Sequence, residues 1–221
     1  MKTAALFSGG KDSCYAVWKA VKQGKEIVSL VAFSPENPDS YMFHHPNVQW
    51  TKLQAEAMDL PLKIVSTKGE KEKELEDLEK ALKQLPIQGV VVGALASQYQ
   101  KSRVEAICKK LGLELFSPAW GIDPDEYWKE LFHNNFRVII TKVACDGLGK
   151  EWLGREINKE NFQELKQLSE KFGFHLAGEG GEFETFVLDG PLFKRKIEIQ
   201  DSGIEWEGDS GIFLVKKAGL I

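Results

Sequence analysis

The chain of 221 residues has little cysteine, no long apolar run and little net charge, and each shortage excludes a class of protein. Its three cysteines, Cys14, Cys108 and Cys145, form no C-x-x-C pair, which argues against a zinc knuckle or a thioredoxin-like redox pair. Such a sparse, odd set is typical of reduced thiols, and we expect a cytoplasmic protein. No apolar run reaches the roughly 18 residues of a membrane helix, and the N-terminus leads directly into an expected strand, without room for a signal peptide. We therefore expect no membrane association.

The charge balance also narrows the range of partners. The chain carries 29 Lys and Arg against 33 Asp and Glu, a formal net charge of −4. A general nucleic-acid-binding surface usually needs an excess of basic residues, so we expect no general nucleic-acid binding. The hydrophobic share of 43% is that of an ordinary globular protein, and the length suffices to bury a substantial core in one large domain or two small ones.

The most informative stretch that is present runs from Thr3 to Ser13. Its apolar run, residues 4–7, predicts a buried strand, the pair Gly9-Gly10 predicts a turn, and residues 12–21 predict a helix. A strand, a glycine turn and a helix start direct several backbone N–H groups at one point, where a phosphate can bind. The glycines also let the backbone approach an anion closely.

The type of this loop follows from the motifs that it does not match. The ATPase loop G-x-x-x-x-G-K-[ST] fails, because Ala5 stands at its first glycine and Asp12 follows Lys11. The dinucleotide fingerprint G-x-G-x-x-G fails too, because the stretch has only its one glycine pair. The letters S-G-G-x-D-S resemble instead the pyrophosphate-binding loop of the ATP pyrophosphatases, which split ATP into AMP and pyrophosphate to adenylate a substrate. A plain glycine turn is the alternative; we expect nucleotide binding by Ser8, Gly9, Gly10, Lys11, Asp12 and Ser13.

Strands and helices alternate over the first half of the chain and predict an α/β fold. Strands are expected at 4–7, 27–33, 62–66, 89–94 and 113–116, and helices at 12–21, 48–60, 70–85 and 99–111. Right-handed crossovers then give a doubly wound, mainly parallel, five-stranded sheet of the Rossmann-like type. Ligands of such sheets bind beyond the carboxyl ends of the strands, so segments 8–13, 34–45 and 93–98 should converge on one crevice.

The pattern changes near residues 118–124, where we place a boundary between a nucleotide-binding domain, 1–121, and a smaller α+β domain, 122–221. The second domain should contain a helix at 125–134, a strand at 136–144, and a helix at 158–172 with Asn158 as its N-cap and Gly173 as its stop. Short alternating segments at 194–200, 203–207 and 211–217 predict a small antiparallel set.

Three stretches together resemble the diphthine–ammonia ligase family, a branch of the ATP pyrophosphatases with an adenine nucleotide α-hydrolase-like fold. The first is the loop at 8–13. The second is residues 93–100, G-A-L-A-S-Q-Y-Q, followed by Arg103, Glu105 and Cys108. The third is residues 178–185, G-E-G-G-E-F-E-T, with Asp189 and Pro191 after it, and it is the stretch most specific to this branch. The resemblance covers essentially the whole chain.

This resemblance implies a reaction. ATP would adenylate the carboxylate of diphthine, a modified histidine of translation elongation factor two, and ammonium would displace AMP to give the amide, diphthamide. No cysteine-nucleophile motif of a glutaminase is visible, so free ammonium is the expected nitrogen source. We expect ATP and Mg²⁺ as cofactors and the elongation factor as the protein partner, with a homodimer left open.

The residues expected to bind ATP lie in the first two stretches. The loop amides, the Ser8 and Ser13 hydroxyls and the Lys11 ammonium would hold pyrophosphate as charge develops on it; a mobile surface lysine is the alternative for Lys11. Asp12 would act through Mg²⁺ or else cap its helix, and we keep both alternatives. Adenine should lie near Phe33 and Ser34. Gly93 either lets ribose or phosphate approach or merely begins a loop. Ser97 is expected to contact ATP, and Arg103 either neutralises a phosphate or packs at a helix start, a packing role that is also the alternative for Tyr99 and Gln100.

The residues expected to act on the substrate are mainly in the third stretch. Its carboxylates stand among apolar residues, which is costly unless Mg²⁺, ammonium or the trimethylamino group of diphthine partners them. We expect this stretch to be a loop that closes over the crevice, with Lys11, Glu182 and Glu184 catalytic. The expected substrate-binding residues are Asn37, Ser40, His44, Tyr99, Gln100, Glu179, Gly180, Gly181 and Thr185.

Two other functions remain open at this point. A different adenylating enzyme, such as a tRNA thiolase, would be expected to have cysteine pairs and a basic face, which this sequence lacks. A nucleotide-binding module without catalysis is the other alternative, and the acidic residues of the third stretch argue against it.

Overall fold

The first half of the chain forms the expected parallel sheet. The computed structural model describes residues 1–35, 47–67 and 73–221, with the side chains of Pro35, Lys73, Tyr99 and Gln100 left aside. The five strands have the order β3-β2-β1-β4-β5, and every neighbouring pair is parallel. They are β1 (Lys2–Leu6), β2 (Glu26–Pro35), β3 (Leu62–Thr67), β4 (Gly89–Val91) and β5 (Glu114–Phe116). The strand order reverses between β1 and β4, so the ligand site of a doubly wound sheet is expected there.

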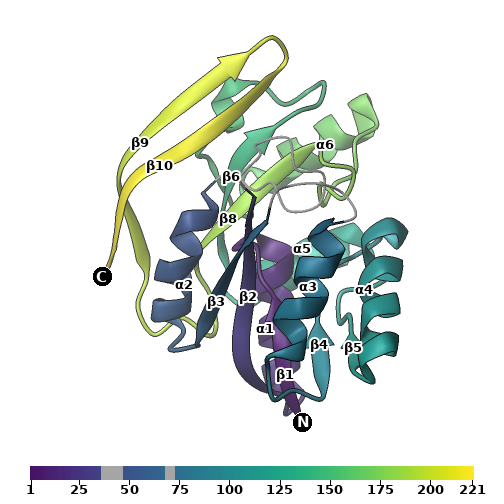
Figure 1. Cartoon of the computed structure of the whole chain (residues 1–221). Coiled ribbons are helices and arrows are strands. Elements are labelled where there is room, and N and C mark those ends of the chain that lie inside the picture. The colour runs from purple at the N-terminus through teal and green to yellow at the C-terminus, as the bar shows by residue number, and fades with distance from the viewer. Residues whose placement is uncertain (36–46, 68–72) are drawn as a thin grey trace.

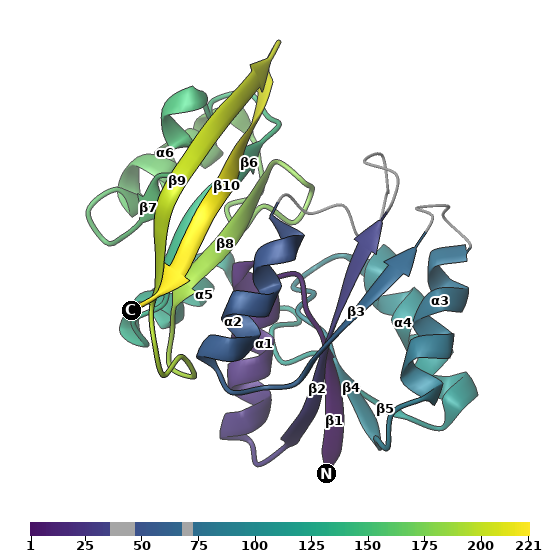
Figure 2. The same ribbon diagram turned by 60° about the vertical axis from the view of Figure 1, so that its left-hand side comes forward.

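Helices cover both faces of this sheet (Figures 1 and 2). On one face lie α1 (Lys11–Lys22) and α2 (Thr51–Ala57), the latter preceded by a 3-10 turn, η1 (Val48–Trp50). On the other lie α3 (Lys73–Lys83) and α4 (Gln98–Leu111). Leu78 and Leu82 of α3 pack with Val104 and Cys108 of α4 in one apolar cluster, so amphipathic helices close that face. The doubly wound α/β class is therefore confirmed.

The second half of the chain is built on an antiparallel sheet. Its central strand, β6 (Arg137–Val143), pairs with β8 (Phe183–Asp189) along one edge and with β7 (Glu156–Ile157) and β10 (Ser210–Leu220) along the other. The long strand β9 (Ile197–Glu207) pairs with β10 and lies at the outer edge. Figure 2 shows this hairpin extending away from the first sheet.

Two helices accompany the second sheet. Helix α5 (Pro124–His133) starts as its sequence dictates, because Asp123 accepts bonds from the N–H groups of Asp125 and Glu126 and Pro124 occupies the first turn. Helix α6 (Phe162–Phe172) ends at Gly173, which has a φ of 75° as expected of a left-handed stop. A short turn, η2 (Lys150–Trp152), precedes β7.

Several expected elements in the second half were wrong. The segments 194–200 and 203–207 do not form separate strands: residues 197–207 are one strand, β9, because Gly203 stays in the ladder opposite Leu214 instead of breaking it. Helix α6 does not start at Asn158, whose side-chain oxygen accepts from the amides of Glu160 and Asn161 in the turn before the helix. The motif at 178–185 is only in part a loop, since β8 begins at Phe183.

The two sheets share one hydrophobic core. Phe7 and Tyr15 from the first half belong to the same buried cluster as Trp128 and Phe183 from the second. The Tyr15 and Tyr127 rings meet edge to face with centroids 4.9 Å apart. The domain limits at 121 and 122 stay a prediction. Among the described residues, no helix is both long enough and apolar enough to span a membrane.

Candidate active site

A cavity of about 300 Å³ opens at the carboxyl ends of β1 and β4, where the strand order reverses. Both halves of the chain line it. The first half supplies Leu6, Phe7, Ser8, Gly10, Lys11, Asp12, Ser13, Val31, Phe33, Val92, Gly93, Ala94, Lys101 and Val104, and the second supplies Gly178, Glu179, Gly181, Phe183, Glu184 and Thr185. Segments 8–13 and 93–94 therefore meet at one cavity with part of the acidic glycine motif.

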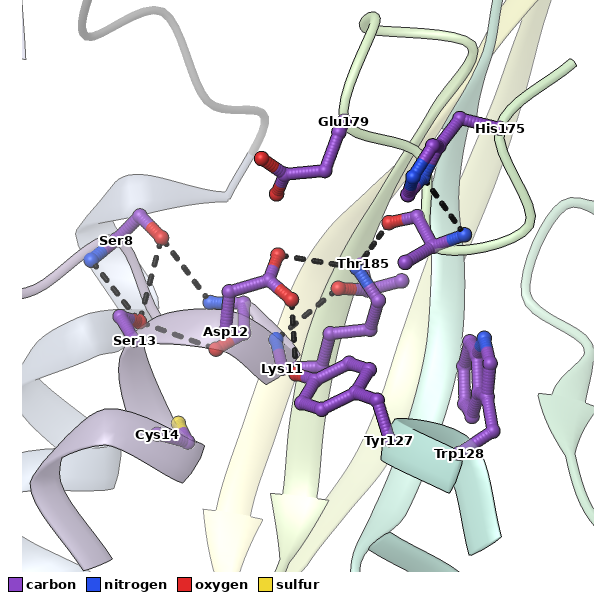
Figure 3. A network of polar contacts seen from close by, with 12 residues as sticks. Ser8, Lys11, Asp12, Ser13, Cys14, Tyr127, Trp128, His175, Glu179 and Thr185 are labelled. Carbon is purple, nitrogen blue, oxygen red and sulfur yellow. Dashed lines mark hydrogen bonds and ion pairs between the residues drawn. The ribbon is translucent and has the colours of Figure 1, made fainter. Parts of the chain in front are cut away.

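The hydroxyl groups of the glycine loop form a small network on the cavity wall (Figure 3). The Ser13 hydroxyl donates to the Gly10 carbonyl at 3.0 Å and lies 3.3 Å from the Ser8 hydroxyl. The Gly10 N–H points to Ser8 Oγ at 3.4 Å. These bonds hold the turn between β1 and α1 in a fixed shape at a helix start, where a phosphate can bind.

Gly9 shapes the loop from its buried side. It has a φ of 80°, and a Cβ there would lie 2.3 Å from Gln54 Oε1. Its carbonyl accepts from Gln54 Nε2 at 2.8 Å and from the Val187 N–H at 3.1 Å, so α2 and β8 both hold it. Gly9 does not line the cavity, and its place in the loop is conformational.

Lys11 is buried, not a surface lysine. Its side chain is 2% exposed, and its ammonium donates to the Ala177 carbonyl at 2.6 Å and to Asp12 Oδ2 at 3.0 Å. The rings of Tyr127, Trp128 and Phe183 have their centroids 5.5 to 6.0 Å from this ammonium. The charge of Lys11 thus links the glycine loop to the second half of the chain.

Asp12 lies between two donors on the cavity wall (Figure 3). Its Oδ2 accepts from Lys11, and its Oδ1 accepts from the Tyr127 hydroxyl at 2.8 Å. Burial, together with the Asp12 carboxylate, raises the pKa of Tyr127 well above its usual value, so this hydroxyl remains a donor. The N-cap of α1 is Gly10, without a side-chain bond, so the expectation that Asp12 caps the helix was wrong.

Gly93 is required by the packing of the glycine loop. A Cβ at this position would lie 2.6 Å from the carbonyl carbon and oxygen of Asp12 and 2.7 Å from the Ser13 nitrogen. These are backbone atoms, which cannot move aside as a side chain can. Gly93 therefore lets the start of α1 approach the end of β4, and it also lines the cavity.

Glu179 joins the acidic glycine motif to the first half of the chain. Its Oε2 accepts from the N–H groups of Ala96 at 2.8 Å and Ser97 at 3.1 Å, immediately before α4. A carboxylate at a helix N-terminus satisfies unpaired amides and opposes the positive end of the helix dipole. Glu179 also lines the cavity.

Thr185 also joins the two halves. The Thr185 hydroxyl accepts from the Lys11 N–H at 3.1 Å, and the Thr185 carbonyl lies close to Gly10. Together with the Val187 N–H bond to Gly9, these contacts make β8 touch the glycine loop at three consecutive residues, 9–11.

The two predicted catalytic glutamates have different surroundings. Glu182 accepts from the N–H groups of His175 and Gly180, both at 2.8 Å, so its carboxylate shapes its own loop. Glu184 lines the cavity, and Lys142 Nζ lies 3.2 Å from its Oε1.

The cysteines offer no activated thiol. Burial raises the pKa of Cys108 and of Cys145 to about 11, and burial raises that of Cys14 further. All three are therefore protonated near neutral pH. Among the residues that the structure describes, no group of three or more His, Cys, Asp or Glu side chains could hold a metal ion.

Family models match the two halves of the chain in turn. A model described as the diphthamide synthase N-terminal domain matches residues 1–115, and one described as the diphthamide synthase C-terminal domain matches residues 123–221. The chain belongs to the diphthamide synthase family. The expected family is thereby confirmed.

Curated relatives named diphthine–ammonia ligase agree with this assignment. The Mus musculus relative is 39% identical over 91% of this chain and 84% of its own length. The Homo sapiens relative is 39% identical over 92% of this chain and 85% of its own length. The Saccharomyces cerevisiae relative is 32% identical over 88% of this chain but only 34% of its own length.

For this diphthamide synthase family member, the structure brings most of the expected site residues together and leaves some apart. Phe33 lines the cavity, whereas Ser34, Ser97 and Arg103 do not. Gly181 lines it, and Gly180 contributes its N–H to Glu182. Asn37, Ser40 and His44, as well as the side chains of Tyr99 and Gln100, lie outside the described part of the chain. The ligand roles of all these residues stay predictions.

Lys101 and Tyr127 were not among the site residues predicted from the sequence. Lys101 directly follows residues 93–100 of the second family-like stretch and stands two residues before Arg103, and helical spacing alone did not distinguish the two. Tyr127 carries no local signal, because its contact with Asp12 spans 115 residues.

Proposed function

We propose that this chain is an ATP-dependent ligase that amidates the carboxylate of diphthine with ammonium and releases AMP and pyrophosphate. The observation that carries the proposal is the shared cavity: the first half of the chain, with its pyrophosphate-type loop, forms one wall, and part of the acidic glycine motif forms the other. We further propose that the diphthine lies on translation elongation factor two, as the family resemblance implies.

The first wall would bind ATP. The hydroxyls of Ser8 and Ser13 and the amides of the loop suit the pyrophosphate part, where negative charge grows as the α-phosphorus is attacked. Val31 and Phe33 offer an apolar surface for adenine on the same wall. The substrate carboxylate attacks the α-phosphorus, pyrophosphate leaves, and an acyl adenylate forms.

The residues present fit a magnesium ion that is held mainly by the nucleotide. Asp12 is a carboxylate on the cavity wall, and Mg²⁺ in such sites commonly uses one or two carboxylates together with substrate phosphates. Bound there, the ion would neutralise phosphate charge. The bonds from Lys11 and Tyr127 fix the orientation of the Asp12 carboxylate.

The second wall would serve the acceptor. Ammonium must lose a proton before nitrogen can attack the acyl adenylate, and Glu184 is a carboxylate on the cavity wall that can take it. Nitrogen then bonds to the acyl carbon, the bond to AMP breaks and AMP leaves, and nitrogen releases a second proton to solvent, so that the amide remains. Glu182 would support this step indirectly, by holding the loop at 175–182 in shape. A homodimer and a cytoplasmic location stay predictions of the sequence.

The test is a reconstituted reaction with purified protein, ATP, ammonium and diphthine-bearing elongation factor two. We expect AMP, pyrophosphate and amide in equal amounts, and AMP only when the factor and ammonium are present together. The matched control is the same factor with an unmodified histidine. AMP formation that depends on tRNA would favour the thiolase alternative, and ATP binding without any AMP would favour a non-catalytic module.

A further inference from the structure

The basic side chains on the cavity wall are not equivalent. Among the described residues, Lys11 and Lys101 are the basic residues that line it. The ammonium of Lys11 is bound to the Ala177 carbonyl and to Asp12 and is almost fully buried. Arg103, which the sequence suggested as a phosphate partner, is not part of the wall. A lysine contact to a ligand phosphate is therefore expected from a residue other than Lys11.

Lys101 is held at the cavity by its neighbours. It lies in the first turn of α4, where its N–H donates to the Ser97 carbonyl at 3.1 Å. Its ammonium lies 4.0 Å from the centroid of the Trp120 ring, within the range of a cation–π contact. The turn that carries Trp120 is tied to the segment after β4, because the Gly121 N–H donates to the Leu95 carbonyl at 2.9 Å.

Helix stability does not explain a lysine at this position. A positive charge in the first turn opposes the helix dipole, whereas Lys109 and Lys110 in the last turn of the same helix favour it. Residues that break such a local rule are expected to concentrate at functional sites.

The charge of Lys101 also remains available to a ligand. The cavity carboxylates already have donors: Asp12 has Lys11 and Tyr127, Glu179 has two backbone amides, and Glu184 has Lys142. Within the described ranges, no carboxylate lies at ion-pair distance from the Lys101 ammonium. Lysine is a usual phosphate partner, as a compact point charge with three donors.

We propose that Lys101, on α4, is the lysine that contacts the phosphate chain of ATP, and that Trp120 positions it. This inference rests on the proposed function only in that ATP is the ligand. Because β1 and β4 are adjacent strands, the glycine loop after β1 and the first turn of α4 after β4 flank the same phosphate chain. Lys11, in contrast, links the loop to the second half of the chain.

The test measures binding without turnover. The affinity of α,β-methylene-ATP and that of adenosine are compared by calorimetry in wild type, Lys101→Met and Lys101→Arg. Loss of a charged hydrogen bond predicts a fall of about tenfold to hundredfold in analogue affinity for Lys101→Met. Adenosine has no phosphate, so its affinity should change by less than about twofold. A twofold change in affinity corresponds to less free energy than one hydrogen bond contributes. Lys101→Arg should retain most of the analogue affinity.

Lys22→Met is the matched control, because Lys22 also stacks on a tryptophan, Trp18, at 5.0 Å but does not line the cavity. We expect it to bind the analogue as wild type does. Unchanged analogue affinity in Lys101→Met would overturn the inference, as would an equal loss of analogue and adenosine affinity. If the wild type itself bound no ATP analogue, the proposed function would fail instead, and the two failures are thereby distinguished.

Discussion

The two walls of the cavity are built in different ways. The first wall comes from the first half of the chain: the end of β1, the glycine loop and the start of α1, with residues of β2 and of the segment after β4 beside them on one parallel sheet. Groups of the second half, on or next to the second wall, bond directly to the first half: the Ala177 carbonyl to Lys11, the Thr185 hydroxyl to the Lys11 N–H, and Glu179 to the amides before α4. One wall follows from local sequence, whereas the other depends on docking of the two halves. The site should therefore be sensitive both to backbone clashes in the first wall and to single hydrogen bonds across the cavity.

The largest effect should come from a clash in the first wall. Gly93→Ala places a Cβ 2.6 Å from backbone atoms of Asp12, and overpacking against backbone should cost about 3 kcal/mol of unfolding free energy. We expect a clear fall in melting temperature together with loss of ATP-analogue binding. Gly203→Ala is the control, because its Cβ would meet only the end of the Lys216 side chain. Equal stability of the two variants would contradict the packing role of Gly93.

A large effect on chemistry alone is expected at the second wall. If Glu184 takes the proton from ammonium, Glu184→Gln should lower kcat about a hundredfold or more, while the affinity for the ATP analogue stays near that of wild type. Glu182→Gln should instead lower stability, because Glu182 bonds to its own loop. Both are measured by single-turnover amide formation and thermal unfolding. Normal ligation by Glu184→Gln with retained ATP binding would reject its chemical role.

An intermediate effect should follow from the contact between the walls at Thr185. Thr185→Val leaves the Lys11 N–H without its acceptor, which should cost about 1–3 kcal/mol, part of it as weaker ATP-analogue binding. Thr185→Ser keeps the hydroxyl and should bind the analogue as wild type does. If serine and valine behave alike, the hydroxyl does not hold the loop.

A smaller effect is expected at Glu179. Glu179→Gln keeps an oxygen for the amides of Ala96 and Ser97 but loses the negative charge at the start of α4. The interaction of that charge with the helix dipole contributes about 0.5–1 kcal/mol. We expect a KM for ATP a few-fold higher at low salt, with a difference that shrinks as salt screens the wild-type charge. If the difference in KM between the variant and wild type did not depend on salt, the charge of Glu179 would not be its cause.

The smallest effect should come from ion pairs between the halves that lie far from the cavity. Asp59 pairs with Lys194 on the surface, and this contact lowers the pKa of Asp59. A carboxyl whose pKa is lower in the folded than in the unfolded protein stabilises the fold at pH values above its unfolded-state pKa, about 4. This stabilisation is lost as the pH falls through the folded-state pKa. Because the pair is exposed, Asp59→Asn should leave ATP-analogue binding at pH 7 unchanged. A marked loss of binding would mean that surface pairs, not the cavity contacts, hold the two halves together.

The two walls also differ in how far the sequence predicts them. Apolar runs such as residues 89–92 and the glycine pair at 9–10 are local signals, so the parallel sheet and its loop could be predicted. The motif at 178–185 was expected to be a loop because glycines and glutamates dominate it. The β-branched and aromatic residues from Phe183 to Val187 were the signal for β8.

Side-chain direction was the part that could not be predicted. The sequence indicated that Lys11 is next to the phosphate loop, but only the docked second half turns its ammonium toward Ala177. The contact of Tyr127 with Asp12 and the place of Lys101 on the cavity wall likewise depend on tertiary packing. For Gly93, one of the two alternatives was a close approach by ribose or phosphate. In the structure, the backbone at the start of α1 lies close to Gly93.

The most direct test of the central claim, that both walls form one site, is a crystal structure with α,β-methylene-ATP and a diphthine-bearing peptide. The account predicts phosphates against the loop at 8–13 and the first turn of α4, with the diphthine carboxylate between the α-phosphate and the wall formed by Glu179, Glu184 and Thr185. A nucleotide bound away from the Ser8–Ser13 loop, or a peptide that makes no contact with residues 178–185, would contradict it.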